Sequence, residues 1–208
     1  MDGLLLDTER ISRETMTTAM AVLGFTMTAA NFIPLIGVPH DVNRLQLAEM
    51  FGPTLDYDAM RAEQARIKAA LYGDQRPLMR GARAIVETVA ALGIPRGGAT
   101  SSQRASAEAH LRHMGLRGLM DAVVTRDDVV RGKPAPDLYL AAAAALGQNP
   151  ADCLALEDSH NGVRAAHAAG VPVIMVPDLL PATDEMRALC LAIAPDLNMV
   201  AGWITAAG

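Results

Sequence analysis

The sequence predicts an α/β protein, in which a parallel sheet carries a small all-helical domain inserted near the start of the chain. Two observations lead to this fold class. Between residues 81 and 176, short apolar runs alternate with helical patterns, which is typical of parallel strands joined by crossover helices. From residue 8 to about 78, helical patterns occur without a convincing strand. The chain has 208 residues, of which 51% are hydrophobic, so it can bury a core.

Three apolar runs bounded by Gly, Pro or acidic residues are predicted to be buried strands: Met120–Thr125, Asp152–Leu156 and Val171–Val176. Ala99–Ser101 could end another strand, although Arg96, Gly97 and Gly98 are poor strand residues. Helices are expected around these runs, at Gly81–Leu92, Ala105–His113, Pro136–Leu146 and Asn161–Ala169. Each is followed by a glycine placed to end it, namely Gly93, Gly115, Gly147 and Gly170.

The helix-only region divides the chain into two expected domains. Its helical patterns are Glu9–Leu23, Val42–Phe51 and Tyr57–Leu71, and Gly73–Leu78 is the expected return hinge. We therefore assign residues 9–78 to a helical cap and residues 1–8 and 79–208 to an α/β core. We expect the cap to move against the core and to exclude water from the site on closing.

Composition excludes several classes of protein. The 18 Lys and Arg against 23 Asp and Glu give a net charge of −5, whereas a nucleic-acid-binding protein would show a basic face. No apolar run approaches the roughly 18 residues of a membrane span, and no secretory signal is evident. The two cysteines, Cys153 and Cys190, are too few for a disulfide framework. We expect a monomer in the cytoplasm with no nucleic-acid or membrane partner.

Four short segments could carry chemistry: Asp2-Gly3 with Asp7-Thr8-Glu9, Thr100-Ser101-Ser102, Gly132-Lys133-Pro134, and Glu157-Asp158-Ser159. The last three follow predicted strands, and the first comes where a strand should have ended. Since ligands of open parallel sheets bind beyond the carboxyl ends of the strands, we expect the four segments to form one cleft.

The residue types in this cleft favour phosphoryl transfer. The adjacent acids Glu157 and Asp158 need a compensating cation, and carboxylate oxygens without nearby His or Cys favour Mg²⁺. Lys133 can hold a phosphate oxygen, and Thr100 and Ser101 lie at a strand-to-helix turn where anions bind. Taken singly, these residues have ordinary explanations as helix caps or solvated loop residues. Their common order and spacing favours a phosphoryl-transfer site.

These four segments resemble the motifs of a known family. The four motifs of the haloacid dehalogenase superfamily, in its beta-phosphoglucomutase-like phosphatase branch, are similar to Met-Asp-Gly-Leu-Leu-Leu-Asp-Thr-Glu (residues 1–9), Ala-Thr-Ser-Ser (99–102), Arg-Gly-Lys-Pro-Ala-Pro-Asp-Leu-Tyr-Leu (131–140) and Leu-Glu-Asp-Ser-His-Asn-Gly-Val-Arg-Ala-Ala-His-Ala-Ala-Gly (156–170). The resemblance spans residues 1 to about 180. It implies a Rossmann-like core with a helical cap inserted after the first motif.

The resemblance also implies roles for individual residues. Asp2 matches the general acid, Thr100 the hydroxyl that binds the transferring phosphoryl group, and Lys133 the lysine that neutralises charge. Asp158 matches the Mg²⁺ ligand, and Glu157 its neighbour, which acts through a water molecule. The expected substrate contacts come from four further residues: Ser101, Ser102, Glu9 and His40. Arg80 is a further candidate for contact with the substrate.

One departure from the family concerns the nucleophile. The family's first motif is Asp-x-Asp-Gly, whose first Asp becomes phosphorylated, and here Met1 stands in the x position. The nucleophile and the apolar strand that leads into it are therefore expected just upstream of Met1. Two explanations stay open, namely that Met1 is an internal methionine of a longer protein, or that this is a short form with lost chemistry.

The expected function is a Mg²⁺-dependent phosphatase that acts on a small phosphorylated metabolite, such as a sugar phosphate, through an aspartyl-phosphate intermediate. A phosphomutase is disfavoured because Ser12 replaces the mutases' His, and Pro39 and His40 stand where they carry an Arg. A non-catalytic form of the fold stays open because of the missing nucleophile. A response-regulator receiver also places acids, a Ser or Thr and a Lys at strand ends, but receivers are shorter and have no cap.

Overall fold

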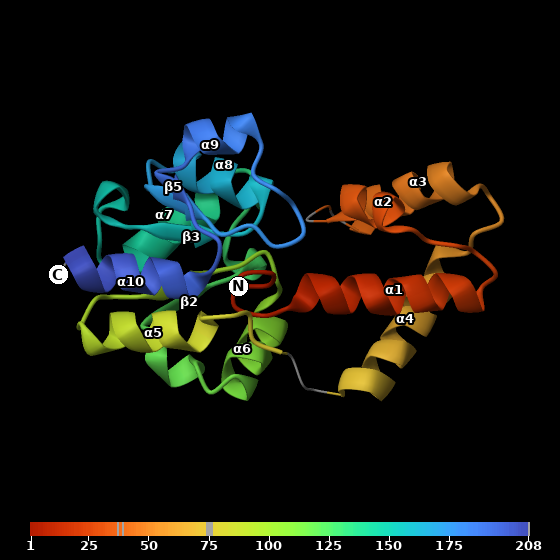
Figure 1. Cartoon of the computed structure of the whole chain (residues 1–208), viewed down its shortest axis with the longest axis horizontal. Coiled ribbons are helices and arrows are strands. Elements are labelled where there is room, and N and C mark those ends of the chain that lie inside the picture. Colours follow the sequence, from red (N-terminus) through yellow and green to blue (C-terminus); the bar gives the residue numbers. More distant parts are fainter. Residues whose placement is uncertain (37, 39, 74–76, 208) are drawn as a thin grey trace. The chain divides into compact units, whose positions relative to one another are not determined.

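The computed structural model describes residues 1–36, 38, 40–73 and 77–207. The chain forms two compact units, one made of Met1–Asp7 with Arg76–Gly208 and the other of Thr8–Gln75 (Figure 1). The second unit begins and ends within three residues of the predicted cap, residues 9–78. The middle of the expected hinge, residues 74–76, lies outside the described residues.

Every regular element among the described residues of the second unit is a helix. Its helices are α1 (Thr8–Val22), α2 (Ala29–Phe32), α3 (His40–Phe51) and α4 (Tyr57–Tyr72), with a 3₁₀ turn at Ile33–Leu35. The buried amide of Gln64 in α4 donates to the Ser12 carbonyl oxygen at 3.2 Å and to Thr15 Oγ1 at 3.4 Å, both in α1. These bonds satisfy polar groups between the two longest helices of the unit, and thereby fix how α1 and α4 pack.

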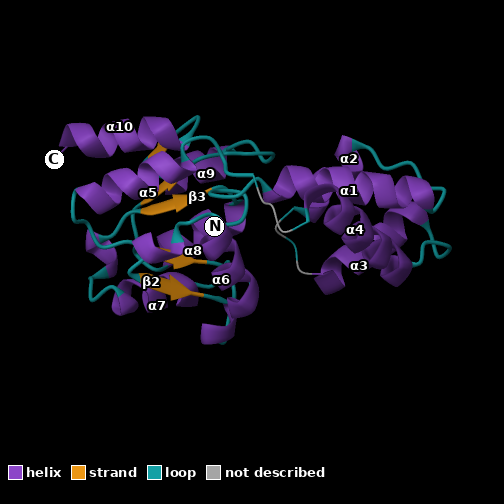
Figure 2. Cartoon of the chain, turned by 90° about the horizontal axis from the view of Figure 1, so that it is seen from below, coloured by secondary structure: helices purple, strands orange, loops and turns teal. Residues whose placement is uncertain are grey.

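The first unit contains short parallel strands in two separate sheets. One sheet pairs β1 (Gly97–Ala99) with β2 (Ala122–Val124), and the other has the order β3 (Ala155–Glu157), β4 (Val173–Met175), β5 (Ala192–Ile193). All three strand pairings are parallel, so the predicted α/β class is confirmed. The helices around the sheets are α5 (Ala82–Ala91), α6 (Arg104–His113), α7 (Asp137–Ala145), α8 (His160–Ala168), α9 (Asp184–Leu189) and α10 (Leu197–Ala207) (Figure 2).

Two strand predictions were wrong in their boundaries. Residues Pro150–Asp152 form a 3₁₀ turn capped by the Asn149 side chain, so β3 begins at Ala155 instead of Asp152. The first strand is the Gly-Gly-Ala segment itself and ends at Ala99. A Cβ atom on Gly97 would lie 3.2 Å from the Ala122 carbonyl oxygen and 3.4 Å from Leu146 Cδ1. Glycine therefore permits a close approach that outweighs its poor strand propensity.

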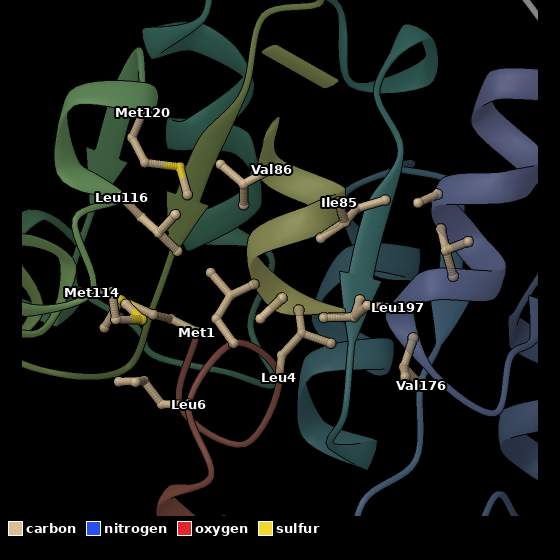
Figure 3. Close-up of a cluster of buried hydrophobic side chains, with 14 of the residues drawn as sticks. Met1, Leu4, Leu6, Ile85, Val86, Met114, Leu116, Met120, Val176 and Leu197 are labelled. Carbon is tan, nitrogen blue, oxygen red and sulfur yellow. The ribbon is translucent and has the colours of Figure 1, made fainter. Parts of the chain in front are cut away.

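The N-terminal segment folds back on itself inside the core of the first unit. The Leu5 and Leu6 amides donate to the Met1 carbonyl oxygen at 2.8 and 3.2 Å, and Gly3 makes the turn possible with a φ of 74°. Met1, Leu4 and Leu6 lie in one apolar cluster with side chains from α5 and α10 (Figure 3). This turn holds Asp2 at the carboxyl ends of the neighbouring strands, next to Thr100.

An apolar cavity of about 490 Å³ lies between the two sheets. Its lining includes all of β1, Ala155 and Leu156 of β3, and Met1. No backbone pairing joins β1 to β3 in the part of the chain that the structure describes, so each of these strands has one unpaired edge. The cavity therefore lies where a further parallel strand would join the two sheets.

No helix among the described residues is long and apolar enough to cross a membrane.

Candidate active site

Side chains from the four motif segments meet in the first unit, at the carboxyl ends of β1 and β3. Asp2 contacts the segment after β1, where Thr100 Oγ1 donates to Asp2 Oδ2 at 3.4 Å. Gly3 lies against the Asp158 carboxylate after β3. Lys133 joins the two strand ends, because its ammonium donates to the Ala99 carbonyl oxygen at 3.2 Å and pairs with Glu157. Residues of all four predicted segments thus meet within one compact unit, whereas Thr8 and Glu9 of the first segment belong to the other unit.

Asp2 is held through both of its carboxylate oxygens. Ser102 Oγ donates to Oδ2 at 2.6 Å, and His110 Nδ1 lies 3.6 Å from Oδ1. Burial by itself raises the pKa of Asp2, but the interactions with His110, the Met1 amino group and Ser102 together hold that pKa well below its usual value. Asp2 is therefore a carboxylate at neutral pH in this arrangement.

Glu157 is almost fully buried, at 3% exposure, and its carboxylate is well supplied with donors. Lys133 and the Tyr139 hydroxyl, the latter at 2.5 Å, both donate to Oε1, and Ser159 Oγ donates to Oε2 at 3.1 Å. Burial raises the pKa of Glu157, but Lys133, the Met1 amino group and the Tyr139 hydroxyl together lower it by more, so the net pKa is below its usual value. The carboxylate packs so closely on α8 that a Cβ atom on Gly162 would lie 1.9 Å from Oε2.

Asp158 is the next residue and has the opposite electrostatic environment. Its burial and the neighbouring Glu157 charge raise the pKa of Asp158 to about 7, from an ordinary 3.8. Lys133, the nearby cation, is already paired with Glu157. The Asp158 carboxylate faces Gly3 so closely that a Cβ atom there would lie 2.1 Å from Oδ2. The site therefore contains a buried carboxylate whose negative charge is poorly compensated.

This donor set fits a hard divalent cation. Asp158 and Glu157 supply oxygen ligands, and the raised pKa of Asp158 marks a place where positive charge would be stabilising. No three His, Cys, Asp or Glu side chains within the described residues cluster closely enough to hold a metal by themselves. A cation at Asp158 would therefore need further ligands, such as backbone oxygens, water or substrate phosphate, which is the usual way in which Mg²⁺ is bound.

The predicted site residues divide into two groups. The structure brings together Asp2, Thr100, Ser102, Lys133, Glu157 and Asp158. The remaining predicted contacts lie elsewhere. Ser101 is exposed, and Ser102 makes the contact with Asp2 instead. Glu9 belongs to α1 in the second unit, and the His40 side chain lies outside the described residues. Arg80 is 83% exposed and pairs with Asp196 at 3.4 Å.

Two residues in contact with this site were missed from the sequence. Tyr139 follows Lys133 by six positions within the third motif, and its place in α7, which packs against β1 and β2, could have been found from that spacing. His110 lies in the last turn of α6, among Ala, Leu and Arg residues whose pattern is typical of an ordinary surface helix. Nothing in the sequence distinguishes it from the neighbouring His113.

Residues 1–170 match a family model described as haloacid dehalogenase-like hydrolase. The chain belongs to this family. It is 34% identical to fructose-1-phosphate phosphatase YqaB of Escherichia coli (strain K12), over 85% of this chain and 93% of the relative. It is 35% identical to hexitol phosphatase B of the same organism, over 85% of this chain and 81% of the relative. A solved haloacid dehalogenase family hydrolase from Deinococcus radiodurans R1, with bound phosphate and sodium, covers 96% of this chain and 90% of its own, with a TM-score of 0.79 and 25% identity.

Proposed function

We propose that the protein is a Mg²⁺-dependent phosphatase that hydrolyses the phosphate ester of a small metabolite, with sugar phosphates as the substrate class. One observation carries the proposal: the acids Glu157 and Asp158, Lys133 and Thr100 gather around Asp2 at the ends of two parallel strands. Acids that hold a cation, a fixed ammonium group and a hydroxyl are the parts that phosphoryl transfer needs.

The chain's own residues have separate tasks in this proposal. Thr100 Oγ1 accepts a hydrogen bond from the Ser102 amide at 3.1 Å, which fixes the hydroxyl for contact with a phosphoryl oxygen. Lys133 is held between Glu157 and the Ala99 carbonyl oxygen, so its charge is directed without rearrangement. Asp2 is proposed to give a proton to the leaving oxygen once the negative charge of the bound substrate has raised its lowered pKa, and its carboxylate form then takes a proton from the attacking water.

Asp158 is the proposed direct ligand of Mg²⁺. Glu157 is already bonded to Lys133, Tyr139 and Ser159, and is therefore proposed to act on the cation through a water molecule. When bound, the cation would neutralise negative charge on the phosphoryl oxygens.

The nucleophile is proposed to be an Asp directly upstream of Met1, which forms an aspartyl-phosphate and is then hydrolysed. Two observations support this position. Met1 and Asp2 match the second and third residues of the family's first motif. The apolar cavity between β1 and β3 has Met1 in its wall, so a strand that enters at Met1 would fill the cavity and place its last residue beside Asp2.

Sugar phosphates are proposed as substrates because the two relatives are named for fructose-1-phosphate and hexitol phosphatase activities. A phosphatase is favoured over a mutase by Ser12. This residue stands where the resemblance places a His in the mutases.

The test uses the chain extended upstream of Met1 by an apolar strand that ends in Asp, called the extended chain below. We expect it to hydrolyse an aryl phosphate and a sugar phosphate with Mg²⁺, and to lose activity on chelation. Asp158→Asn should lose most of this activity, since it removes a charge that holds the cation. Asp184→Asn, at an exposed acid in the first turn of α9, is the matched control and should keep it. Wild-type turnover and metal dependence in Asp158→Asn would overturn the assignment of the site.

A further inference from the structure

His110 has a geometry that the roles assigned above do not explain. It lies in α6 with its side chain only 20% exposed, and its Nδ1 atom is 3.6 Å from Asp2 Oδ1. This nitrogen is buried and has no hydrogen-bond partner among the described residues. A buried polar atom without a hydrogen bond lowers the stability of the folded state, so the position of this nitrogen next to a carboxylate needs an explanation.

The two oxygens of Asp2 are held by different parts of the chain. Oδ2 accepts from Ser102 Oγ at 2.6 Å and Thr100 Oγ1 at 3.4 Å, whereas Oδ1 faces His110. Asp2 itself belongs to a tight turn made by residues 1–6. A group that faces Oδ1 therefore determines whether this carboxylate can rotate away from Thr100.

The other charged groups of α6 have partners of their own. Arg104 donates to Asp128 at 2.5 Å, Arg112 lies 3.7 Å from Glu108, and Arg117 from the next turn donates to Glu108 at 2.9 Å. These ion pairs engage the arginines of α6 elsewhere, whereas the His110 imidazole faces Asp2.

We propose that His110 is a positioning residue for Asp2: a hydrogen on Nδ1 holds Oδ1 while Ser102 holds Oδ2, so that the proton-handling carboxylate keeps one orientation beside Thr100. This inference rests on the proposed function for the role of Asp2. The contact itself does not depend on it. A short movement of the imidazole would bring His110 Nδ1, now 3.6 Å from Asp2 Oδ1, to hydrogen-bonding distance.

The contact is tested without any activity measurement. Nitrogen NMR of the imidazole rings reports which nitrogen carries the hydrogen, and the loss of one signal in His110→Gln assigns it among the five histidines. We expect hydrogen on Nδ1 of His110 in the chain and in the extended chain, and a change to hydrogen on Nε2 alone in Asp2→Asn. A His110 ring with hydrogen only on Nε2, and unchanged by Asp2→Asn, would overturn the proposal.

The positioning role is tested in the extended chain with a matched pair of variants. The amide of Asn reaches the place of Nδ1 and the amide of Gln the place of Nε2. We expect His110→Gln to lower kcat about tenfold and to leave KM within about twofold of wild type. A tenfold loss is smaller than the roughly 10²–10⁴-fold rate enhancement of general acid–base catalysis, because the variant misplaces Asp2 but does not remove it. His110→Asn should recover most of the loss.

Three results are informative here. Equal kcat in wild type and His110→Gln would overturn the role, and equal losses in both variants with lowered thermal stability would show a merely structural residue. An extended chain without any phosphatase activity would refute the proposed function instead, while the imidazole signals would still decide whether His110 holds Asp2.

Discussion

Glu157 and Asp158 are consecutive in the chain, yet the electrostatic surroundings of their carboxylates are opposite. The Glu157 side is closed and balanced, because Lys133, Tyr139 and Ser159 all donate to its carboxylate. The Asp158 side is packed against Gly3, and burial together with the Glu157 charge outweighs the attraction of the Met1 amino group and Lys133, so the pKa of Asp158 rises to about 7. The comparison indicates that Glu157 holds neighbouring side chains of the site in place, whereas Asp158 is available to bind a cation.

The largest expected effect comes from removing the cation on the Glu157 side. Lys133→Met leaves a buried carboxylate without its ion-pair partner, and breaking a buried pair in this way costs about 3–5 kcal/mol. Urea unfolding measures the loss. The double variant Lys133→Met with Glu157→Gln should recover part of it, since no buried charge is then left unpaired. An unfolding free energy of Lys133→Met within about 1 kcal/mol of wild type would contradict the conclusion that Lys133 compensates the buried Glu157 charge.

A smaller loss is expected from crowding the same carboxylate. In Gly162→Ala, the new methyl group would lie 1.9 Å from Glu157 Oε2, so the carboxylate must leave its donors. Lost hydrogen bonds to a charged group cost about 1.5–3 kcal/mol. Gly202→Ala in α10 is the matched control, because nothing lies within 4 Å of its added Cβ atom and alanine favours a helix by about 1 kcal/mol. Equal stability of the two variants would show that Glu157 can move freely.

An effect of opposite sign is expected on the Asp158 side. Because the pKa of Asp158 is raised from 3.8 to about 7, the folded state binds a proton that the unfolded state releases. Stability should therefore fall as the pH rises from about 4 to about 7 in metal-free buffer. Because Asp158→Asn lacks the titrating group, its melting temperature should be above that of wild type at pH 8 and equal to it at pH 4.

Magnesium sharpens the same experiment. Added Mg²⁺ should raise the melting temperature of wild type at pH 8 and leave that of Asp158→Asn unchanged, since a ligand that binds the folded state stabilises it. A variant that melts below wild type at pH 8 without metal would mean that Asp158 is already compensated inside the protein.

The sequence predicted the parts of the fold that local patterns control. Helices with strong propensity and a glycine at the end were placed within a few residues, and the motif residues Lys133, Glu157 and Asp158 were brought together as expected. What failed depended on distant neighbours. Gly97 is in a strand because it packs against Leu146 and Ala122, and the contact between His110 and Asp2 joins residues with no common pattern. The segments from residue 184 onward, α9, β5 and α10, carry too little periodicity to predict.

The place where the chain leaves and re-enters the first unit has an evolutionary consequence. The Asp7 amide donates to the Pro77 carbonyl oxygen at 2.9 Å, and Leu6 pairs with Leu78 as in an antiparallel hairpin. The whole segment between them is therefore a loop on a two-strand stem, whose ends meet whatever its length. Such an insertion can be exchanged or excised without stretching the core, because only a tight turn is needed to close the stem. A family could then acquire new substrates by replacing this one segment, while Lys133, Glu157 and Asp158 stay where they are.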